Sequence, residues 1–216
     1  ENSILIIVES LYSMEGSISP LKEITEICKK YNVELLVDEA HALGVLGPEG
    51  RGLSFSLSNC ITLITGTFGK AFGSGGAFIA CDSEFGEYLI QTSGAYRYTT
   101  SLSPALAAGA LKALQKIKNN NEWGLDLLNS AQKWKIEILR NFNYPVKGDA
   151  HILSIIVGEE EKAMHLQKYL EEKGFLAIAI RPPTVPLGES RIRITIRKDL
   201  DNKILKKFIS ALKDYK

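Results

Sequence analysis

The sequence lacks the features that mark disulfide-rich, zinc-binding and membrane-spanning proteins. Its 216 residues include only three cysteines, and none are in a CxxC spacing, so neither a disulfide framework nor a zinc site is indicated. Isolated thiols favour a reducing compartment, and we expect a cytoplasmic protein. No apolar run approaches the roughly 18 residues that a bilayer-spanning helix needs. The N-terminus also lacks the basic region and cleavage site of a signal peptide.

An excess of charge of either sign is also lacking. The chain has 26 basic and 25 acidic residues and a net charge of +1. This balance gives no electrostatic footprint for nucleic acid or an anionic membrane, and we expect neither as a partner. A starting methionine is absent as well. The opening ENSILIIVES is typical of the middle of a fold, so we expect an N-terminal part to precede it.

Short apolar runs predict strands in the first half. The run ILIIV, residues 4–8, is rich in branched side chains and is typical of a strand buried on both faces in a parallel sheet. Further strands are predicted at 33–40, 61–65 and 76–80. A helix is expected to follow the first strand, with Ser19 as its N-cap and Pro20 at its first position. Alternation of strand and helix predicts an α/β fold with a mostly parallel sheet.

The second half has a different texture. Long helical patterns cover 104–119 and 121–142, and then come a strand, a helix, two strands and a helix. These later elements are expected at 151–157, 159–174, 175–180, 191–196 and 199–215. The pattern predicts a small α+β domain. We place the boundary near residue 118, so that 1–118 is the C-terminal part of a larger domain and 119–216 is the small one.

Polar side chains gather where the first three strands are expected to end. In open α/β sheets, ligands bind outside the carboxyl ends of the strands, so these residues predict one site. They are Glu9, Ser13, Asp38, His41, Thr67 and Lys70.

Lys70 lies between two glycine clusters in TFGKAFGSGG. A phosphate-binding P-loop would need glycine at Ile64 and Ser or Thr at Ala71, so that motif fails. A dinucleotide fingerprint starting at Gly73 fails because Phe78 stands where its third glycine belongs. Two interpretations remain open: a solvated turn lysine, and a lysine that forms a Schiff base with a carbonyl.

The strand VELLVDEAH also has two interpretations. Its end resembles the DEAH box of helicases, in which Asp holds Mg²⁺ and Glu orients water, so a DEAH-type ATPase fragment is one hypothesis. The second half lacks an arginine-rich helicase motif. Alternatively, Asp38 and Lys70 are the pair that pyridoxal phosphate requires, because the lysine holds the aldehyde and the aspartate holds the ring nitrogen protonated.

Five ordered motifs then make a resemblance specific. They are SLYSMEGSISPL, LLVDEAHALGVLGPEGRG, TGTFGKAFGSGGAF, YTTSLSP and RPPTVPLGESRIRITI. Together they resemble the α-oxoamine synthase family of fold-type I pyridoxal phosphate enzymes, over nearly the whole chain. The resemblance implies part of the large cofactor domain of that fold, followed by its small C-terminal domain.

The resemblance also implies residue roles. Lys70 matches the Schiff-base lysine, Asp38 the partner of the pyridinium nitrogen, and His41 a histidine near the cofactor's phenolic oxygen and the substrate. Ser13 matches a serine that hydrogen-bonds that oxygen, and Thr67 matches a phosphate ligand.

Three further residues complete the set of site residues that the resemblance implies. Thr99 and Thr100 match a segment that reaches the phosphate of the neighbouring subunit, and Arg191 matches an arginine that binds the amino-acid carboxylate. Arg191 and Arg193 alternate in a strand, and we expect at most one of them to face the site; the resemblance points to Arg191, so Arg193 is expected to be structural. Taken alone, Ser13 could simply cap a turn, and Thr99 and Thr100 could be ordinary strand residues.

The resemblance is strongest to the biotin-pathway members of the family. These are homodimers that condense L-alanine with a pimeloyl thioester, on coenzyme A or an acyl carrier protein, to give 8-amino-7-oxononanoate. Glycine C-acetyltransferase, 5-aminolevulinate synthase and serine palmitoyltransferase activities are the sibling alternatives, and a non-catalytic partner subunit is another. The family also has a ring-stacking histidine and a phosphate-binding glycine segment upstream of Glu1. If the 216 residues were the whole molecule, half of the cofactor pocket would be absent, and we would not expect activity from this chain alone.

Overall fold

The computed structural model describes residues 4–215, and their contacts divide the chain into two compact units. The first unit holds Glu1–Leu11 and Ser19–Gly124. The second holds Leu125–Lys216 together with a short earlier segment, Tyr12–Ile18. The division along the chain therefore falls at Gly124 rather than near residue 118, and seven residues from the N-terminal region pack with the C-terminal unit.

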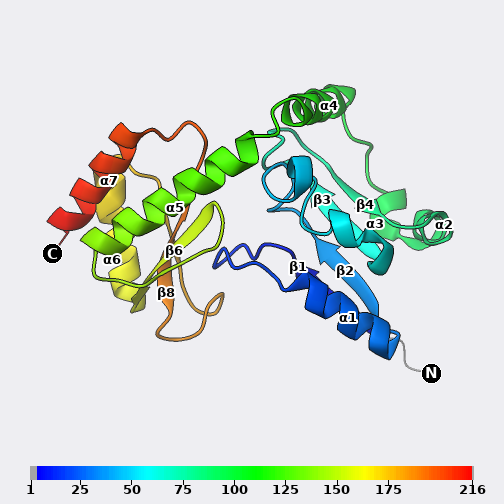
Figure 1. Ribbon diagram of the computed structural model, residues 1–216, viewed down its shortest axis with the longest axis horizontal. Coiled ribbons are helices and arrows are strands. Elements are labelled where there is room, and N and C mark those ends of the chain that lie inside the picture. Colours follow the sequence, from blue (N-terminus) through cyan, green and yellow to red (C-terminus); the bar gives the residue numbers. More distant parts are fainter. Residues whose placement is uncertain (1–3, 216) are drawn as a thin grey trace. The chain divides into compact units, whose positions relative to one another are not determined.

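The first unit is built on a four-stranded sheet in the order β1-β2-β3-β4 (Figure 1). Its strands are β1 (Leu5–Glu9), β2 (Glu34–Asp38), β3 (Leu63–Thr67) and β4 (Ala77–Ala80). The first three strands run parallel, and β4 returns antiparallel to β3 as a hairpin. This arrangement confirms the predicted α/β fold with a mostly parallel sheet, in which the helix at Leu21–Tyr31 supplies the crossover that the parallel neighbours β1 and β2 need.

Two details at the start of the chain differ from expectation. Strand β1 is not buried on both faces: Leu5 and Ile7 are 47% and 65% exposed, whereas Ile6 and Val8 pack beside α1 (Leu21–Tyr31). The predicted burial on both faces is not found because, among residues 4–215, apolar side chains cover only the face that carries Ile6 and Val8.

The helix start is the second difference. Pro20, not Ser19, is the N-cap residue of α1, and the cap makes no side-chain hydrogen bond. The Ser19 hydroxyl instead donates to the carbonyl of Glu9 at 2.6 Å. Ser19 therefore does not cap α1 with its side chain. Its hydroxyl instead connects the chain just before the helix to the end of β1.

The other elements of the first unit are helical. Helix α4 (Pro104–Lys118) follows the predicted pattern, whereas α2 (Ser83–Thr92) and α3 (Gly94–Arg97) were not predicted. Asp82 caps α2 by accepting a hydrogen bond from the backbone of Phe85 at 2.7 Å. Two short 3₁₀ turns, Pro48–Gly50 and Phe55–Cys60, lie in the loop between β2 and β3.

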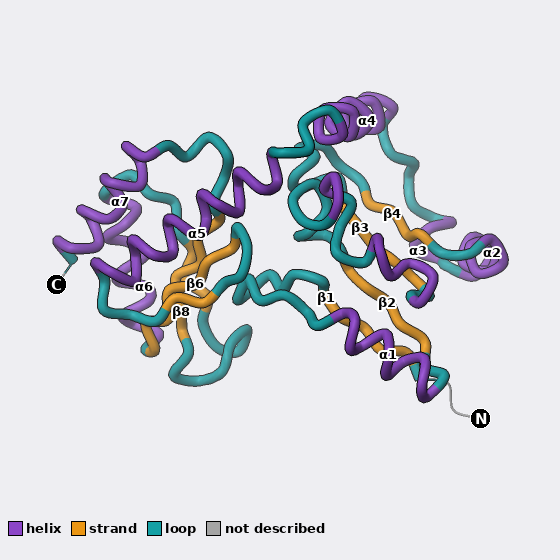
Figure 2. The backbone as a smooth tube through the Cα atoms, in the orientation of Figure 1, coloured by secondary structure: helices purple, strands orange, loops and turns teal. Residues whose placement is uncertain are grey.

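The second unit has an antiparallel sheet in the order β5-β6-β8-β7. The strands are β5 (Val146–Lys147), β6 (Ile152–Gly158), β7 (Ile178–Ile180) and β8 (Ser190–Thr195). The helices are α5 (Trp123–Asn141), α6 (Glu160–Glu172) and α7 (Asn202–Asp214), and Figure 2 shows them in purple against the orange strands. Only the two-residue strand β5 was missing from the predicted pattern.

One face of this sheet carries the core of the unit. Because strand side chains alternate, Leu153, Ile155 and Ile192 point to one face, where they meet the three helices. The helices contribute Trp134, Ile138, Leu166, Leu170, Phe208 and Leu212. The opposite face carries Arg191 and Arg193, so the same alternation separates the apolar core from a charged surface of the sheet.

Candidate functional site

Three parallel strands of the first unit end together at one edge of the sheet. The register places Glu9 of β1 beside Asp38 of β2, and Asp38 beside Thr65 of β3. Two residues beyond Thr65, Thr67 closes β3. The edge therefore presents two carboxylates and two hydroxyls on neighbouring strands, which is the position where α/β sheets bind ligands.

Asp38 lines a hollow of this unit. Its side chain is half-buried, and its Oδ1 accepts a hydrogen bond from the backbone of Ala40 at 2.8 Å. This bond fixes the carboxylate, and no group within residues 4–215 donates to Oδ2. The hollow has a volume of about 630 Å³ and is lined by Asp38, Thr65, Thr67, Phe78, Ile79 and Tyr96, among others. It is large enough to hold a planar ring beside Asp38.

Lys70 lies in the loop that joins β3 to β4. The loop is held by hydrogen bonds from Phe68 N to Gly76 O at 2.9 Å and from Gly73 N to Lys70 O at 2.9 Å. Gly73 and Gly76 have φ of 57° and 95°, a region that side-chain-bearing residues rarely adopt. The glycines thus allow a tight, hydrogen-bonded loop that carries an exposed lysine three residues beyond β3.

The remaining residues of the first unit that were predicted for the site are Thr67, His41, Thr99 and Thr100, and their surroundings differ from one another. Thr67 uses its hydroxyl within the hairpin, donating to Gly76 O and accepting from Gly69 N, both at 3.1 Å. His41 is half-buried in the turn that follows β2. Thr99 and Thr100 are exposed and lie outside any strand, between α3 and α4. The lining of the hollow therefore brings together Asp38 and Thr67 only, of the residues predicted for the site.

Glu39, next to Asp38, is a structural carboxylate. It is fully buried, accepts from the Ser10 hydroxyl at 2.6 Å and from the Ser54 backbone at 2.5 Å, and lies against Gly52, where a Cβ would come within 2.7 Å of its carboxyl carbon. Both oxygens are thus occupied. A DEAH-type ATPase needs this glutamate free to orient water, so the geometry speaks against that hypothesis.

The two arginines of β8 have contrasting surroundings on the outer face of the second sheet. Arg191 is completely buried, and its guanidinium bonds Glu15 Oε1 at 2.8 Å, Glu189 Oε2 at 3.0 Å and Glu189 O at 3.0 Å. No part of the guanidinium is exposed, so Arg191 does not present the accessible donors that a substrate carboxylate would need.

Arg193 is half-buried and forms no ion pair with a carboxylate in the part of the chain that the structure describes. Its Nε donates to the carbonyl of Ser13 at 2.6 Å, and burial lowers the pKa of its guanidinium. The two arginines lie on the same face of the sheet, and the one without a carboxylate partner among residues 4–215 is Arg193. The resemblance implied Arg191 as the arginine for the substrate carboxylate, and the sequence could not show its ion pairs because the partner carboxylates are remote in sequence or in the preceding turn.

His151 is buried beside Arg193, and its Nδ1 lacks a hydrogen-bond partner among the described residues. Burial, with a smaller contribution from the charge of Arg193, lowers the pKa of His151 to about 4. Its imidazole is therefore neutral at pH 7. In the unfolded chain, the histidine pKa returns to its ordinary value, so between the two values the unfolded chain binds more protons than the folded one.

We expect this difference to destabilise the fold as the pH falls. The free energy of unfolding is unaffected by His151 above the pKa of this histidine in the unfolded chain. Below that value it falls by about 1.4 kcal/mol per pH unit until the pH reaches the folded-state pKa of about 4. Urea unfolding at pH 7.5 and pH 5 measures the change, and His151→Gln should lose about 2 kcal/mol less between these conditions than the wild type. His165→Gln is the control, because that histidine is exposed. An equal loss in wild type and His151→Gln would contradict the expectation.

Comparison with known proteins identifies the fold and its family. The profile of the family described as aminotransferase class I and II matches residues 1–212. A protein from Marinobacter nauticus named 8-amino-7-oxononanoate synthase is 37% identical over 196 residues, covering 89% of this chain and 50% of its own length. The chain thus spans about half the length of the curated relatives it matches.

Two solved structures show the same fold. A serine palmitoyltransferase from Sphingomonas wittichii superposes with a TM-score of 0.91 at 26% identity, over 99% of this chain and 54% of its own. An 8-amino-7-oxononanoate synthase from Francisella tularensis superposes with a TM-score of 0.83 at 27% identity, over 98% of this chain and 62% of its own. Separately, no helix within residues 4–215 is long and apolar enough to cross a bilayer.

Related serine palmitoyltransferase structures contain pyridoxal phosphate, the cofactor of this family. The residues at the strand ends fit that group: Asp38 lines a hollow of about 630 Å³, and the primary amine of Lys70 follows the adjacent strand. With a family profile matching almost its whole length and relatives of one kind in sequence and structure, the chain belongs to the class I and II aminotransferases, within their α-oxoamine synthase branch.

Proposed function

We propose that this chain is part of an enzyme that condenses L-alanine with a pimeloyl thioester, carried on coenzyme A or an acyl carrier protein. The products are 8-amino-7-oxononanoate, CO₂ and the free thiol. The observation that carries the proposal is the placement of Asp38 and Lys70 after adjacent parallel strands, in a chain whose relatives are named 8-amino-7-oxononanoate synthase. A cytoplasmic homodimer belongs to the same proposal.

Each residue contributes a separate step. Pyridoxal phosphate, when bound, supplies an aldehyde that condenses with amines and a ring that withdraws electrons from the adjacent carbon. Asp38 would hold the ring nitrogen and keep it charged. Lys70 would hold the aldehyde and, once released from it, would take the α-proton of alanine as a general base. His41 stabilises negative charge on the thioester oxygen.

Arg193 is our candidate for binding the alanine carboxylate. Arg191 already forms ion pairs with Glu15 and Glu189 and is fully buried. Arg193 has no such pair among residues 4–215 and keeps part of its surface open. A carboxylate arriving at Arg193 gains charge-assisted hydrogen bonds without displacing a protein carboxylate.

The remaining residues are proposed to bind the cofactor. Ser13 donates to the phenolic oxygen, and Thr67 binds the phosphate. For this, Thr67 has to exchange a hydrogen bond of its hairpin for one to the phosphate. Thr99 and Thr100 would reach the phosphate of a neighbouring subunit, a role consistent with their exposed position. The three free cysteines agree with a reducing compartment.

The function is tested by asking which amino acid loses its α-proton. The intact gene product with pyridoxal phosphate is incubated in D₂O with L-alanine, glycine or L-serine, and NMR follows deuterium at the α-carbon. We expect faster α-proton exchange with alanine than with glycine or serine, because alanine is the proposed substrate. The assay reports the amino acid directly, whereas the volume of the hollow, about 630 Å³, does not identify the acyl chain. Mass spectrometry then checks for 8-amino-7-oxononanoate when pimeloyl-CoA is added.

The alternatives give different outcomes in the same experiment. Faster exchange with glycine would favour the acetyltransferase or aminolevulinate activities, and faster exchange with serine would favour the palmitoyltransferase activity. ATP hydrolysis dependent on Mg²⁺, with no exchange, would replace the proposal by the ATPase hypothesis. Absence of both would favour a non-catalytic partner subunit.

A further inference from the structure

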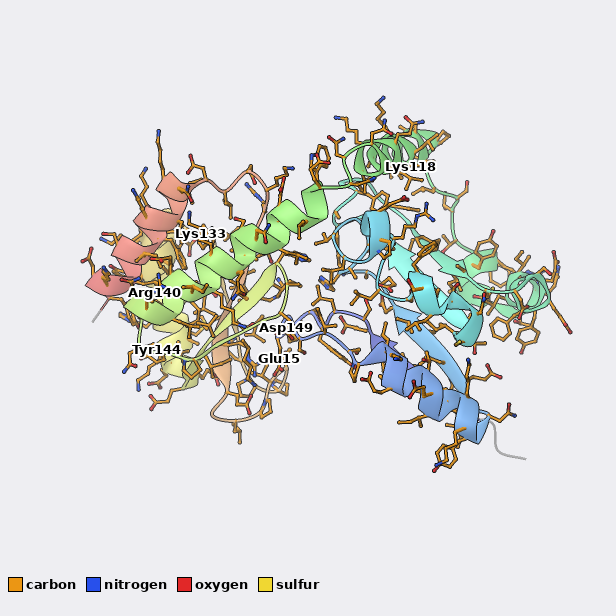
Figure 3. All side chains as sticks on the ribbon, viewed as in Figure 1. Glu15, Lys118, Lys133, Arg140, Tyr144 and Asp149 are labelled. Carbon is orange, nitrogen blue, oxygen red and sulfur yellow. The ribbon has the colours of Figure 1, made fainter. Side chains whose placement is uncertain are left out.

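The segment Tyr12–Ile18, the docked loop, leaves the first unit and belongs by its contacts to the second. It closes on itself through hydrogen bonds from Tyr12 N to Ser17 O and from Gly16 N to Tyr12 O, both at 2.9 Å. Glu15, labelled in Figure 3 near Asp149, projects from its middle. The loop carries Ser13, so what holds the loop also holds a proposed cofactor ligand.

Backbone contacts bring the docked loop onto the outer face of the β6–β8 sheet. The Ser154 hydroxyl donates to Met14 O at 2.8 Å, and Asp149 N donates to Gly16 O at 2.7 Å. Gly16 has φ of 72°, and a Cβ there would lie 2.0 Å from Ile152 O. Only glycine permits this approach, so the loop is fitted to the strand at backbone distance.

The side chain of Arg191 forms the charged part of this contact. The arginine is in β8, an inner strand of the sheet, and is fully buried between the loop carboxylate Glu15 and Glu189. Lys147 approaches the same two carboxylates at 3.5 and 3.7 Å. Two cations therefore face two anions. A hydrogen bond from Arg191 is the largest influence on Glu15 and lowers its pKa, so the loop carboxylate is charged at neutral pH.

A buried guanidinium tolerates the loss of a carboxylate poorly, because the remaining charge lies out of reach of water. The energy of this ion pair thus depends on the loop being in place. Glu189 precedes β8 in sequence and stays near Arg191 whether or not the loop is docked, whereas Glu15 arrives only with the loop. Of the contacts to Arg191, the one to Glu15 is specific for docking.

We propose that Arg191 is a positioning residue: by pairing with Glu15 it fixes the docked loop, and with it Ser13, on the outer face of the second sheet. The role given to Ser13 rests on the proposed function, whereas the fixation of the loop does not. Because the loop is held before any ligand binds, Ser13 loses little conformational freedom when it donates to the cofactor. Arg191 acts on the reaction through the loop and touches no substrate.

Hydrogen exchange of the unliganded gene product tests the fixation. The amides of Tyr12, Gly16 and Ile18 are hydrogen-bonded in the docked loop. We expect these amides to exchange about 10- to 100-fold faster in Arg191→Gln and in Glu15→Gln, since a charge-assisted bond is lost. Amides of β6 should be unchanged. Arg197→Gln is the matched control, because that arginine pairs with Asp199 at the surface.

The variants also separate a positioning role from general stability. Should Arg191→Gln not fold, Glu15→Gln carries the test, because it leaves Arg191 paired to Glu189. Arg191→Lys keeps the charge but not the planar guanidinium that bonds both Glu15 and Glu189, so we expect intermediate protection of the loop. Loop protection equal to wild type in Glu15→Gln, or a loss spread evenly over β6, would overturn the proposal.

A second measurement connects the loop to the site. In the pyridoxal phosphate complex, Glu15→Gln should shift the pH profile of the cofactor absorption in the same direction as Ser13→Ala, while Arg197→Gln should not. An unshifted profile in Glu15→Gln beside a shifted one in Ser13→Ala would overturn the link to Ser13. Failure of the wild type to bind pyridoxal phosphate would instead refute the proposed function and leave the exchange result standing.

Discussion

The Lys70→Ala variant is expected to lose both covalent attachment of pyridoxal phosphate and turnover. Alanine has no amine to condense with the aldehyde or to take the α-proton, and loss of a general base alone costs about 10²- to 10⁴-fold in rate. Borohydride reduction followed by mass spectrometry should find the cofactor on wild type and not on the variant. The α-proton exchange of L-alanine should fall by about 10³-fold or more.

Lys118→Ala is the matched control for this experiment. Lys118 is likewise exposed, at the end of α4, and is labelled in Figure 3. Its loss should leave attachment and exchange unchanged. If the cofactor were still attached to Lys70→Ala, the lysine in TFGKAFG would be an ordinary turn lysine, which is the interpretation that residue type alone favours.

Asp38→Asn is expected to keep the cofactor attached and yet react slowly. The amide fills the same space and can keep the hydrogen bond from Ala40 N, but it carries no charge to hold the ring nitrogen protonated. Removing one preorganised electrostatic group costs about 10²- to 10³-fold in kcat. Exchange of the alanine α-proton measures the rate, and reduction with mass spectrometry measures attachment on the same sample.

A carboxylate elsewhere on the surface supplies the comparison. Asp199 pairs with Arg197 in full solvent exposure, and Asp199→Asn should behave as wild type in both measurements. A normal exchange rate in Asp38→Asn would mean that the charge at the end of β2 does not act on the ring. The hollow beside Asp38 would then need another explanation.

Much of the fold is predictable from residue spacing, because branched apolar runs and helix-stop signals act locally. The β3–β4 pair is an example: ITLIT and GAFIA predict strands, and the glycines between them predict the loop that carries Lys70. Whether one or both faces of a strand are covered depends on residues far away in the sequence, so it cannot be predicted from the strand itself. Leu5 and Ile7 have the composition of a strand covered on both faces, yet the described residues cover one.

The site is predictable only as far as its chemistry is encoded in neighbouring residues. Asp38 was identified because it ends a strand beside the strand that leads to Lys70. The sequence could not show that Arg191 is paired with a carboxylate while Arg193 is not, because that difference depends on Glu15, 176 positions away from Arg191. Alternation along β8 shows that the two arginines share one face of the sheet, but which of them meets a carboxylate follows from the loop alone.

The origin of Glu15 in a distant part of the chain also limits how the protein can be taken apart. A fragment starting at Leu125 would contain every strand of the second sheet but lack the docked loop. Arg191 would then lose Glu15, and the carbonyl that accepts from Arg193 would be missing as well. A chimera that takes this unit from one enzyme and the first unit from another therefore has to include residues 12–18 from the same parent as the second unit.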